Sequence, residues 1–177
     1  MKRITKSDAV RELETFTDNV ESVILSTVSK KGEPFASYSP FVEDKEGNFY
    51  VFISTAVPHS HNMFSTKKAH IMFLEDESKT EHIYARRRLY FSAECEKFEE
   101  DDVREEDILK LFKEKFRSRV SFFSSMKDSR IYKLKPSNGN IILGFGSAFK
   151  VNENRKEVSL SEREHSKSHE AGLAKYE

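Results

Sequence analysis

The chain is poor in several features that would define common protein classes: it has one cysteine, no tryptophan, six glycines, four prolines and no net formal charge. The single Cys95 excludes an internal disulfide and fits a reducing compartment. The 30 basic and 30 acidic residues give no net field to attract nucleic acid or an anionic membrane. No run approaches the roughly 18 apolar residues of a membrane span, and the first twenty residues do not resemble a secretory signal. We therefore expect a cytoplasmic protein without nucleic-acid or membrane partners.

Phenylalanine is unusually common, with 15 copies. Aromatic side chains are major contributors to protein cores and interfaces, so the simplest interpretation is a barrel core or a subunit interface. A pocket for a flat conjugated ligand is the alternative that composition leaves open.

Short apolar runs separated by turn residues predict a mainly β protein. A first helix is predicted from Ser7 or Asp8 to about Asp18, and a second at 59–68. The acidic run 99–106 fits the N-terminal turn of a third helix, whose apolar stripe lies between Ile108 and Phe116. Asn138-Gly139 is typical of a hairpin turn. Strands are predicted at 22–28, 34–42, 49–53, 70–74, 87–97, 130–134 and 140–151.

Hairpin-linked strands of this number predict an antiparallel β-barrel with helices at its rim. After Val151 the chain is polar and charged, and composition gives it no core to join. We therefore divide the chain into a barrel domain, 1–151, and a C-terminal tail, 152–177.

Familiar catalytic motifs are absent from the sequence. There is no Gly-rich phosphate loop, Cys-x-x-Cys pair, zincin pattern or nucleophile elbow. Cys95 lies on the apolar face of a predicted strand, which favours a core role over a nucleophile. Histidines, arginines and the polar tail remain as candidates for chemistry.

A series of short segments, in a fixed order along nearly the whole chain, carries a family resemblance. They are Leu25-Ser-Thr-Val28 with Gly32-Glu-Pro34, Ser37-Tyr-Ser-Pro-Phe41, His59-Ser-His-Asn62, Glu75-Asp-Glu77, Ala85-Arg-Arg-Arg-Leu89, Asp128 before Ile131-Tyr-Lys-Leu134, Gly144-Phe-Gly-Ser-Ala-Phe149 and Glu162-Arg-Glu-His165. Their order and content resemble the pyridoxamine-phosphate-oxidase-like split barrels that bind FMN, and most closely the HugZ/HutZ heme-degrading branch.

The resemblance implies an antiparallel split β-barrel with peripheral helices and an extended C-terminal tail. It implies a heme oxygenase that opens the porphyrin and releases iron, using dioxygen and an electron donor or reductase. Heme would lie at the interface of a homodimer near Gly144, Phe145 and Gly146, with His165 as the ligand to iron. Neutral imidazole is a good ligand for heme iron.

The residues alone leave the role of His165 open, because a single histidine in a polar tail is ordinarily solvated. His169 is a rival ligand, and on a helical turn it would share a face with His165. The match of Glu-x-Glu-His to the family's tail favours His165.

Two charged residues complete the site that the resemblance implies. Asp128 resembles the carboxylate that hydrogen-bonds the ligand histidine from the partner subunit and strengthens it as a donor. A turn or cap role for Asp128 is equally compatible with its local sequence. Arg88 matches the family's distal arginine, which would stabilise dioxygen in the site or pair with a heme propionate. Surface charge at a strand start is the alternative for Arg86, Arg87 and Arg88.

The segment around His59 bears on which cofactor binds. His59, His61 and Asn62 fall where flavin-binding relatives hold the FMN phosphate, but two histidines replace the usual basic or small residues. A helix cap over the barrel is the simpler interpretation of His59. Two alternative functions follow: an FMN-binding oxidoreductase, and a non-catalytic heme carrier or storage protein.

Overall fold

The strands form one antiparallel sheet that closes on itself. The computed structural model describes residues 4–120, 126–152, 155 and 157–160. Within these residues the strands are β1 (Ser22–Val28), β2 (Pro34–Glu43), β3 (Phe49–Ser54), β4 (Lys68–Leu74), β5 (Arg88–Lys97), β6 (Ser129–Ile142), β7 (Ala148–Val151) and β8 (Val158–Leu160).

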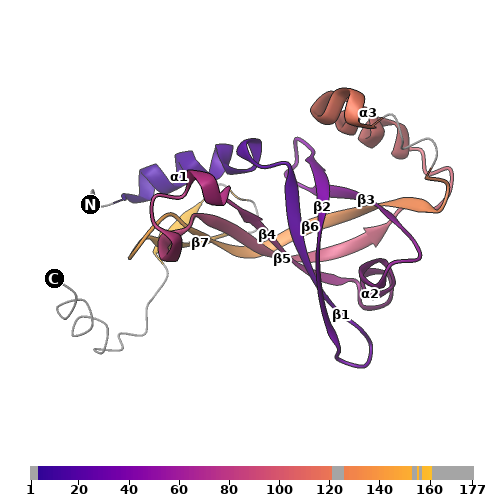
Figure 1. Cartoon of the computed structure of the whole chain (residues 1–177), viewed down its shortest axis with the longest axis horizontal. Helices are drawn as coiled ribbons and strands as arrows, with labels where there is room; N and C mark the ends of the chain where they lie inside the picture. Colours follow the sequence, from indigo (N-terminus) through magenta and orange to yellow (C-terminus); the bar gives the residue numbers. More distant parts are fainter. Residues whose placement is uncertain (1–3, 121–125, 153–154, 156, 161–177) are drawn as a thin grey trace.

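The strand order is β3-β2-β1-β4-β5-β6-β7-β8, and β3 also pairs with β6. The first six strands therefore close into a barrel, while β7 and β8 continue the sheet from the second half of β6. This arrangement confirms the predicted antiparallel split barrel with peripheral helices. Figure 1 shows β7 near one end of the molecule, and α2 (Pro58–Thr66) and α3 (Glu105–Phe116) toward the other.

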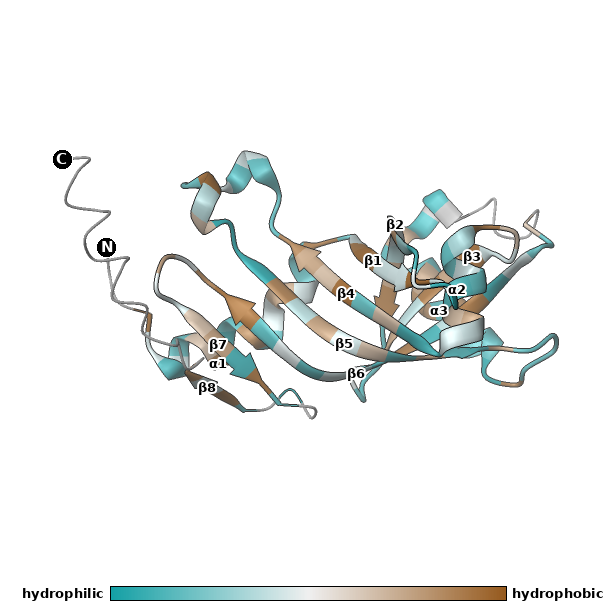
Figure 2. Ribbon diagram, turned by 90° about the horizontal axis from the view of Figure 1, so that it is seen from below, coloured by the Kyte–Doolittle hydropathy of each residue, from teal (hydrophilic) through white to brown (hydrophobic). Residues whose placement is uncertain are grey.

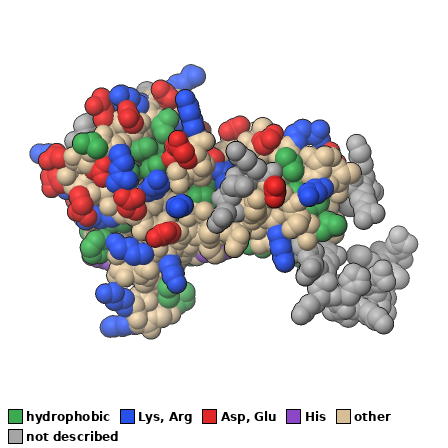
Figure 3. All heavy atoms as spheres, turned by 180° about the vertical axis from the view of Figure 1, so that it is seen from behind, with side chains coloured by type: hydrophobic (Ala, Val, Ile, Leu, Met, Phe, Trp, Pro, Cys, Tyr) green, Lys and Arg blue, Asp and Glu red, His purple; other side chains and the backbone are tan. Residues whose placement is uncertain are grey.

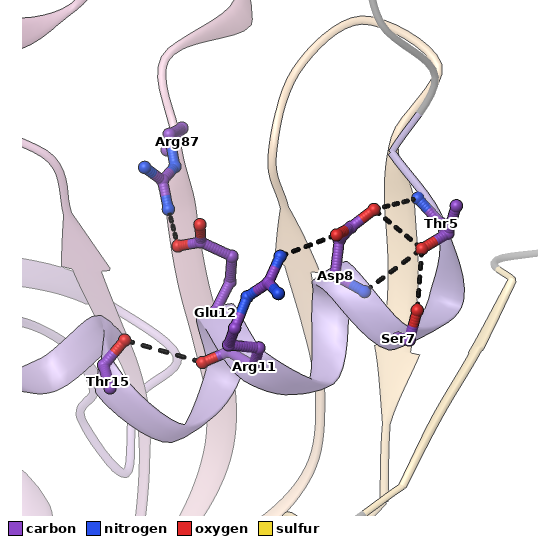
Figure 4. Close-up of polar contacts among 7 residues, drawn as sticks. All are labelled: Thr5, Ser7, Asp8, Arg11, Glu12, Thr15 and Arg87. Atoms are coloured by element: carbon purple, nitrogen blue, oxygen red, sulfur yellow. Dashed lines mark hydrogen bonds and ion pairs between the residues drawn. The ribbon is translucent and has the colours of Figure 1, made fainter.

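The first helix, α1 (Lys6–Thr15), packs at the β7–β8 end of the barrel. The predicted start at Ser7 or Asp8 is wrong, because Thr5 is the cap. The Thr5 hydroxyl accepts from the Asp8 amide at 3.2 Å, and the Asp8 carboxylate accepts from the Thr5 amide at 3.0 Å. Glu12 forms an ion pair with Arg87 just before β5, which fastens the helix to the barrel (Figure 4).

Alternation along the strands builds the barrel core. The β5 side chains Leu89 and Phe91 are fully buried, while the intervening Tyr90 faces outward. Phe41, Phe49, Phe73 and Phe91 contact one another with ring centroids 4.6–6.3 Å apart. Brown apolar residues alternate with teal polar ones along β4, β5 and β6 in Figure 2. The phenylalanine content is thus largely used in the core.

The helices α2 and α3 fall near their predicted positions. The structure ends α2 at Thr66 and gives Lys67 a left-handed backbone, with φ 58°. The helix α3 begins at Glu105, so only Glu105 and Glu106 of the acidic run 99–106 lie in its first turn. The residues before them form turns, and Asp101 has φ 62°.

The predicted hairpin turn at Asn138-Gly139 is wrong. The strand β6 continues through these residues and pairs with β5 on both sides of a register shift between Phe91 and Ala93. A Cβ on Gly139 would lie 2.2 Å from the Tyr90 carbonyl oxygen and 2.3 Å from the Phe91 ring. The glycine therefore permits a close approach between strands at an irregular position, not a chain reversal.

The prediction that no residue after Val151 joins the core is also wrong. Val158 pairs with Val151 in the β7–β8 ladder and is 2% exposed within the main core cluster. The ordered sheet thus continues to Leu160, and β8 runs antiparallel to β7, back toward the turn that joins β6 to β7. Residues 161–177 lie outside the described residues.

The surface carries mixed charge. Acidic and basic side chains are interspersed over the face in Figure 3, in keeping with the zero net formal charge. None of the helices in the described part of the chain has the length and apolar character needed to cross a bilayer.

Candidate functional site

The three consecutive arginines before and at the start of β5 differ in their partners. Arg86 donates from Nε to the Glu75 carbonyl oxygen at 2.7 Å, and Arg87 pairs with the Glu12 carboxylate. Arg88 donates from Nη1 only to the Arg86 carbonyl oxygen, at 2.9 Å, and no carboxylate among the described residues pairs with it. The half-buried guanidinium of Arg88 therefore keeps unused hydrogen-bond donors for an anionic group.

The position of Arg88 follows from strand alternation. Leu89 points into the barrel and is fully buried, so Arg88 lies on the outer face of the sheet. Its register partners are Leu74 in β4 and Ile142 in β6. Arg88 therefore lies opposite Ile142, two residues before Gly144 in the turn that follows β6.

That turn contains the Gly144-Phe145-Gly146 run, so the prediction of one strand over 140–151 is wrong: these residues are divided between β6 and β7. The Leu143 amide donates to the Ser147 carbonyl oxygen at 3.0 Å and closes the reversal between β6 and β7. Gly146 has φ 69°, a backbone conformation that residues other than glycine rarely adopt. Phe145 at the tip is 52% exposed, so the turn presents an aromatic ring to its surroundings.

Asp128 immediately precedes β6 at the opposite end of that strand. Its exposed carboxylate accepts from the Ser54 hydroxyl at 2.5 Å, and its carbonyl oxygen accepts from the Thr55 amide at 2.9 Å. Asp128 therefore ties the end of β3 to the start of β6, which gives it a local structural role. Its role toward a ligand histidine stays a prediction.

His59 lies in the first turn of α2, which begins soon after β3 ends. The imidazole is 6% exposed, and neither ring nitrogen has a hydrogen-bond partner within the described part of the chain. The ring stacks on Phe35 with centroids 5.8 Å apart. Burial lowers the pKa of His59, so the ring is neutral at pH 7.

The predicted site residues fall into two groups at opposite ends of β6. Asp128 and His59 lie at the β3 end, whereas Arg88 and the Gly144–Gly146 turn lie at the β7 end. A strand of 14 residues spans on the order of 40 Å at about 3.3 Å per residue. One chain does not bring the two groups together. His165 and His169 lie outside the described residues.

Cys95 is a core residue, as predicted. It is 3% exposed on β5, and burial raises the pKa of its thiol to about 12, so the reactive thiolate is not available.

Sequence reasoning missed a histidine beside the Gly144–Gly146 turn. His82 lies in the loop between β4 and β5, and its ring contacts that of Phe145. A single histidine in a polar loop carries no spacing or periodicity signal, so only the folded arrangement of the loop identifies it.

The fold agrees with that of a known family. Residues 9–142 match the family model of pyridoxamine 5′-phosphate oxidase, which covers most of the chain. The chain therefore belongs to the pyridoxamine-5′-phosphate-oxidase-like split barrels.

Comparison with individual relatives identifies the branch of this family to which the chain belongs. The chain is 31% identical over 140 residues to the heme oxygenase HutZ of Vibrio cholerae, covering 79% of each chain. Its structure is similar to Campylobacter jejuni ChuZ, with a TM-score of 0.79, 29% identity and 90% of this chain covered. The match spans 64% of ChuZ. Crystalline Vibrio cholerae HutZ, described as a heme storage protein, gives a TM-score of 0.69 at 29% identity, covering 76% of this chain and 93% of HutZ. Within its family the chain belongs to the HugZ/HutZ branch.

Proposed function

We propose that this protein binds heme between two copies of the chain and degrades it, opening the porphyrin ring and releasing iron. The observation that carries the proposal is the unpaired guanidinium of Arg88 beside the exposed Phe145 turn. This is the end of the molecule at which β8 leads into the remaining chain that contains His165. The named heme relatives support the choice of ligand.

The residues at this end fit the chemistry of heme. Phe145 offers an apolar ring for a flat macrocycle, and Arg88 offers two-pronged hydrogen bonding for a carboxylate such as a propionate. An imidazole from His165 is a suitable axial ligand. When bound, heme supplies the oxidative chemistry, together with dioxygen and electrons from a donor or reductase. The chain binds and orients the group, neutralises its carboxylates and excludes water.

A second copy of the chain completes the site. His165 follows Leu160 by five residues, a length that spans at most about 18 Å when fully extended. Because Leu160 lies near the β6–β7 turn, His165 can reach Arg88 and Phe145 of its own chain. Its own Asp128 lies about 40 Å away along β6. If Asp128 supports the ligand histidine, it therefore comes from the partner.

The outer face of the sheet offers a surface for that partner. Tyr38, Ile24, Met72 and Tyr90 occupy opposite positions on four neighbouring strands, which makes a continuous apolar row across the outside of the barrel. Tyr38 is 72% exposed, and the other three are half-buried in the single chain. Burying this row in a homodimer removes exposed apolar surface from water.

Hemin titration tests heme binding and its ligand. The intact chain should take up hemin with a sharp Soret band, and His165→Ala should lose that band while His169→Ala keeps it. A chain ending at Leu160 keeps β8 in the barrel and should behave like His165→Ala. Equal spectra for the intact and shortened chains would contradict ligation by the tail.

A turnover experiment distinguishes heme degradation from non-catalytic heme storage. With ascorbate or a reductase in air, the Soret band should decay as a ring-opened tetrapyrrole forms and iron is released. A Soret band that persists unchanged, with no such product, would favour the non-catalytic heme carrier.

The alternative of an FMN-binding oxidoreductase is weakened at His59. Its buried, neutral imidazole stacks on Phe35 where the family resemblance would put a phosphate, and this ring offers a phosphate dianion one N–H donor and no positive charge. We expect the purified protein to be free of flavin and to take up no added FMN. A purified protein that is yellow with bound flavin and does not bind hemin would overturn the heme proposal.

A further inference from the structure

Two loops that are far apart in sequence meet through aromatic rings at the β7 end of the barrel. The rings of His82 and Phe145 lie edge to face, with centroids 4.8 Å apart and an interplanar angle of 79°. The Tyr84 ring lies 6.0 Å from that of His82. All three side chains are exposed, Tyr84 by 82% and Phe145 by 52%. We call His82, Tyr84 and Phe145 the aromatic cluster.

The loop that carries His82 is fixed at its base. The Glu75 amide donates to the Arg87 carbonyl oxygen at 3.0 Å, and Arg86 donates back to the Glu75 carbonyl oxygen. The His82 carbonyl oxygen accepts from the Ala85 amide at 2.9 Å, which starts a short 3₁₀ turn. The backbone of His82 is therefore held in place by local hydrogen bonds.

The imidazole of His82, in contrast, is available. No side chain or backbone group in the described part of the chain hydrogen-bonds either ring nitrogen, and the ring contacts those of Tyr84 and Phe145. Exposed aromatic rings that meet across two loops are typical of a ligand-binding surface. The imidazole adds a group whose ring nitrogens can bind a metal or hydrogen-bond a carboxylate.

We propose that His82 is a heme-binding residue that the Phe145 ring positions against the porphyrin. This inference rests on the proposed heme function. The occupant follows from three features at this end of the chain: the unpaired Arg88, the direction of β8, and a reach of about 18 Å from Leu160 to His165. A flat apolar ring system with carboxylates at one edge matches aromatic rings beside an unpaired arginine.

The direct test follows the histidine signals in an NMR spectrum of the full chain during titration with zinc protoporphyrin, a diamagnetic probe that undergoes no turnover. The His82 imidazole signal, assigned from its loss in His82→Ala, should shift strongly through the porphyrin ring current. The same titration of the His82→Ala variant is the control, because every histidine signal that still shifts there belongs to another residue.

Affinity measurements with hemin provide the second test. His82→Ala and Phe145→Ala should each weaken hemin binding about tenfold. The double variant should lose less affinity than the product of the two single losses, because the two rings act as a pair. Arg119→Ala, which removes a surface ion pair with Glu21, is the control and should bind as the wild type does. In His82→Phe the ring contact is kept and the nitrogens are lost, so recovery of affinity would identify packing as the main contribution.

The outcomes separate this inference from the heme function itself. If the wild type binds hemin through His165 but His82→Ala binds equally well and the His82 signal does not move, His82 is not a heme residue and the heme function stands. If removing residues 161–177 moves the His82 signal and porphyrin does not, the tail covers the cluster and the inference is wrong. If the wild type takes up no porphyrin, both proposals fail.

Discussion

At the scale of single residues, the partners of a side chain distinguish Arg88 from its neighbours. Arg88→Ala should weaken hemin binding about tenfold, because one charge-assisted hydrogen bond to a carboxylate contributes roughly 1.4 kcal/mol or more. Arg119, which pairs with Glu21 on the surface, offers a control: Arg119→Ala should leave the affinity unchanged. Equal hemin dissociation constants for the two variants would show that Arg88 is only surface charge.

The buried His59 predicts how stability depends on pH. Burial lowers the pKa of its imidazole in the folded chain below the value of about 6.5 in the unfolded chain. The unfolded chain therefore binds the proton more readily, and the free energy of unfolding falls as the pH drops below about 6.5. Urea unfolding between pH 7 and pH 5 should show this loss.

His59→Phe isolates that contribution. Phenylalanine keeps a ring against Phe35 and removes two buried nitrogens without partners, so stability at pH 7 should change little and the loss at acid pH should shrink. The exposed His61→Ala should retain the wild-type pH dependence. A wild-type slope in His59→Phe would mean that other groups titrate in this range.

The sequence predicted Arg88, Asp128 and the Gly144–Gly146 run as site residues only through their order along the chain. The family resemblance selected Arg88, but the residues alone did not separate it from Arg86 and Arg87, because ion pairing depends on which acidic residues the fold brings near. His82 was missed for the same reason, since Phe145 reaches it only through the folding of two loops.

At the scale of elements, Gly139 explains why β6 is one strand. Gly139→Ala should lower the free energy of unfolding by about 1–3 kcal/mol, because its Cβ would overlap the Tyr90 carbonyl oxygen and the Phe91 ring. The exposed neighbour offers a control, Asn138→Ala, which should cost far less. Urea unfolding of both variants measures the difference, and equal stability would contradict the close approach.

The short strand β8 predicts that thermal stability depends on where the chain is shortened. A chain ending at Leu160 should keep the wild-type melting temperature, whereas one ending at Val151 exposes core that Val158 covers. Losing a buried valine costs about 1.5–3 kcal/mol, which corresponds to several degrees in a protein of this size. Equal melting temperatures would show that β8 contributes nothing to the barrel.

Most strands were predictable because their alternation is regular and turn residues separate them. The exceptions have physical causes. Asn-Gly favours a hairpin locally, but the contact of Gly139 with β5 decides its conformation. Three residues of β8 are too few to show a period, so its pairing with β7 is visible only in the folded sheet.

At the scale of the whole molecule, the barrel separates Asp128 from the Arg88 end by the length of β6. A two-fold dimer resolves this separation by bringing the Asp128 end of one chain to the Arg88 end of the other. The account therefore requires each heme site to draw residues from both chains, with His165 and Arg88 from one and Asp128 from its partner.

A mixed dimer tests that requirement most directly. One chain carries Asp128→Asn and the other His165→Ala, each with a different affinity tag, so that the mixed dimer is purified by both. In this dimer the intact His165 faces the intact Asp128 only if the two come from different chains. The measurement is the pH dependence of hemin binding, since a carboxylate behind the ligand imidazole alters its competition with protons.

The account predicts one hemin per mixed dimer, bound with the pH dependence of the wild type. The Asp128→Asn homodimer should bind two hemins with a shifted pH dependence, and the His165→Ala homodimer should bind none through an axial imidazole. A mixed dimer that instead keeps the shifted profile of Asp128→Asn would contradict the account, because Asp128 would then act within its own chain or not at all.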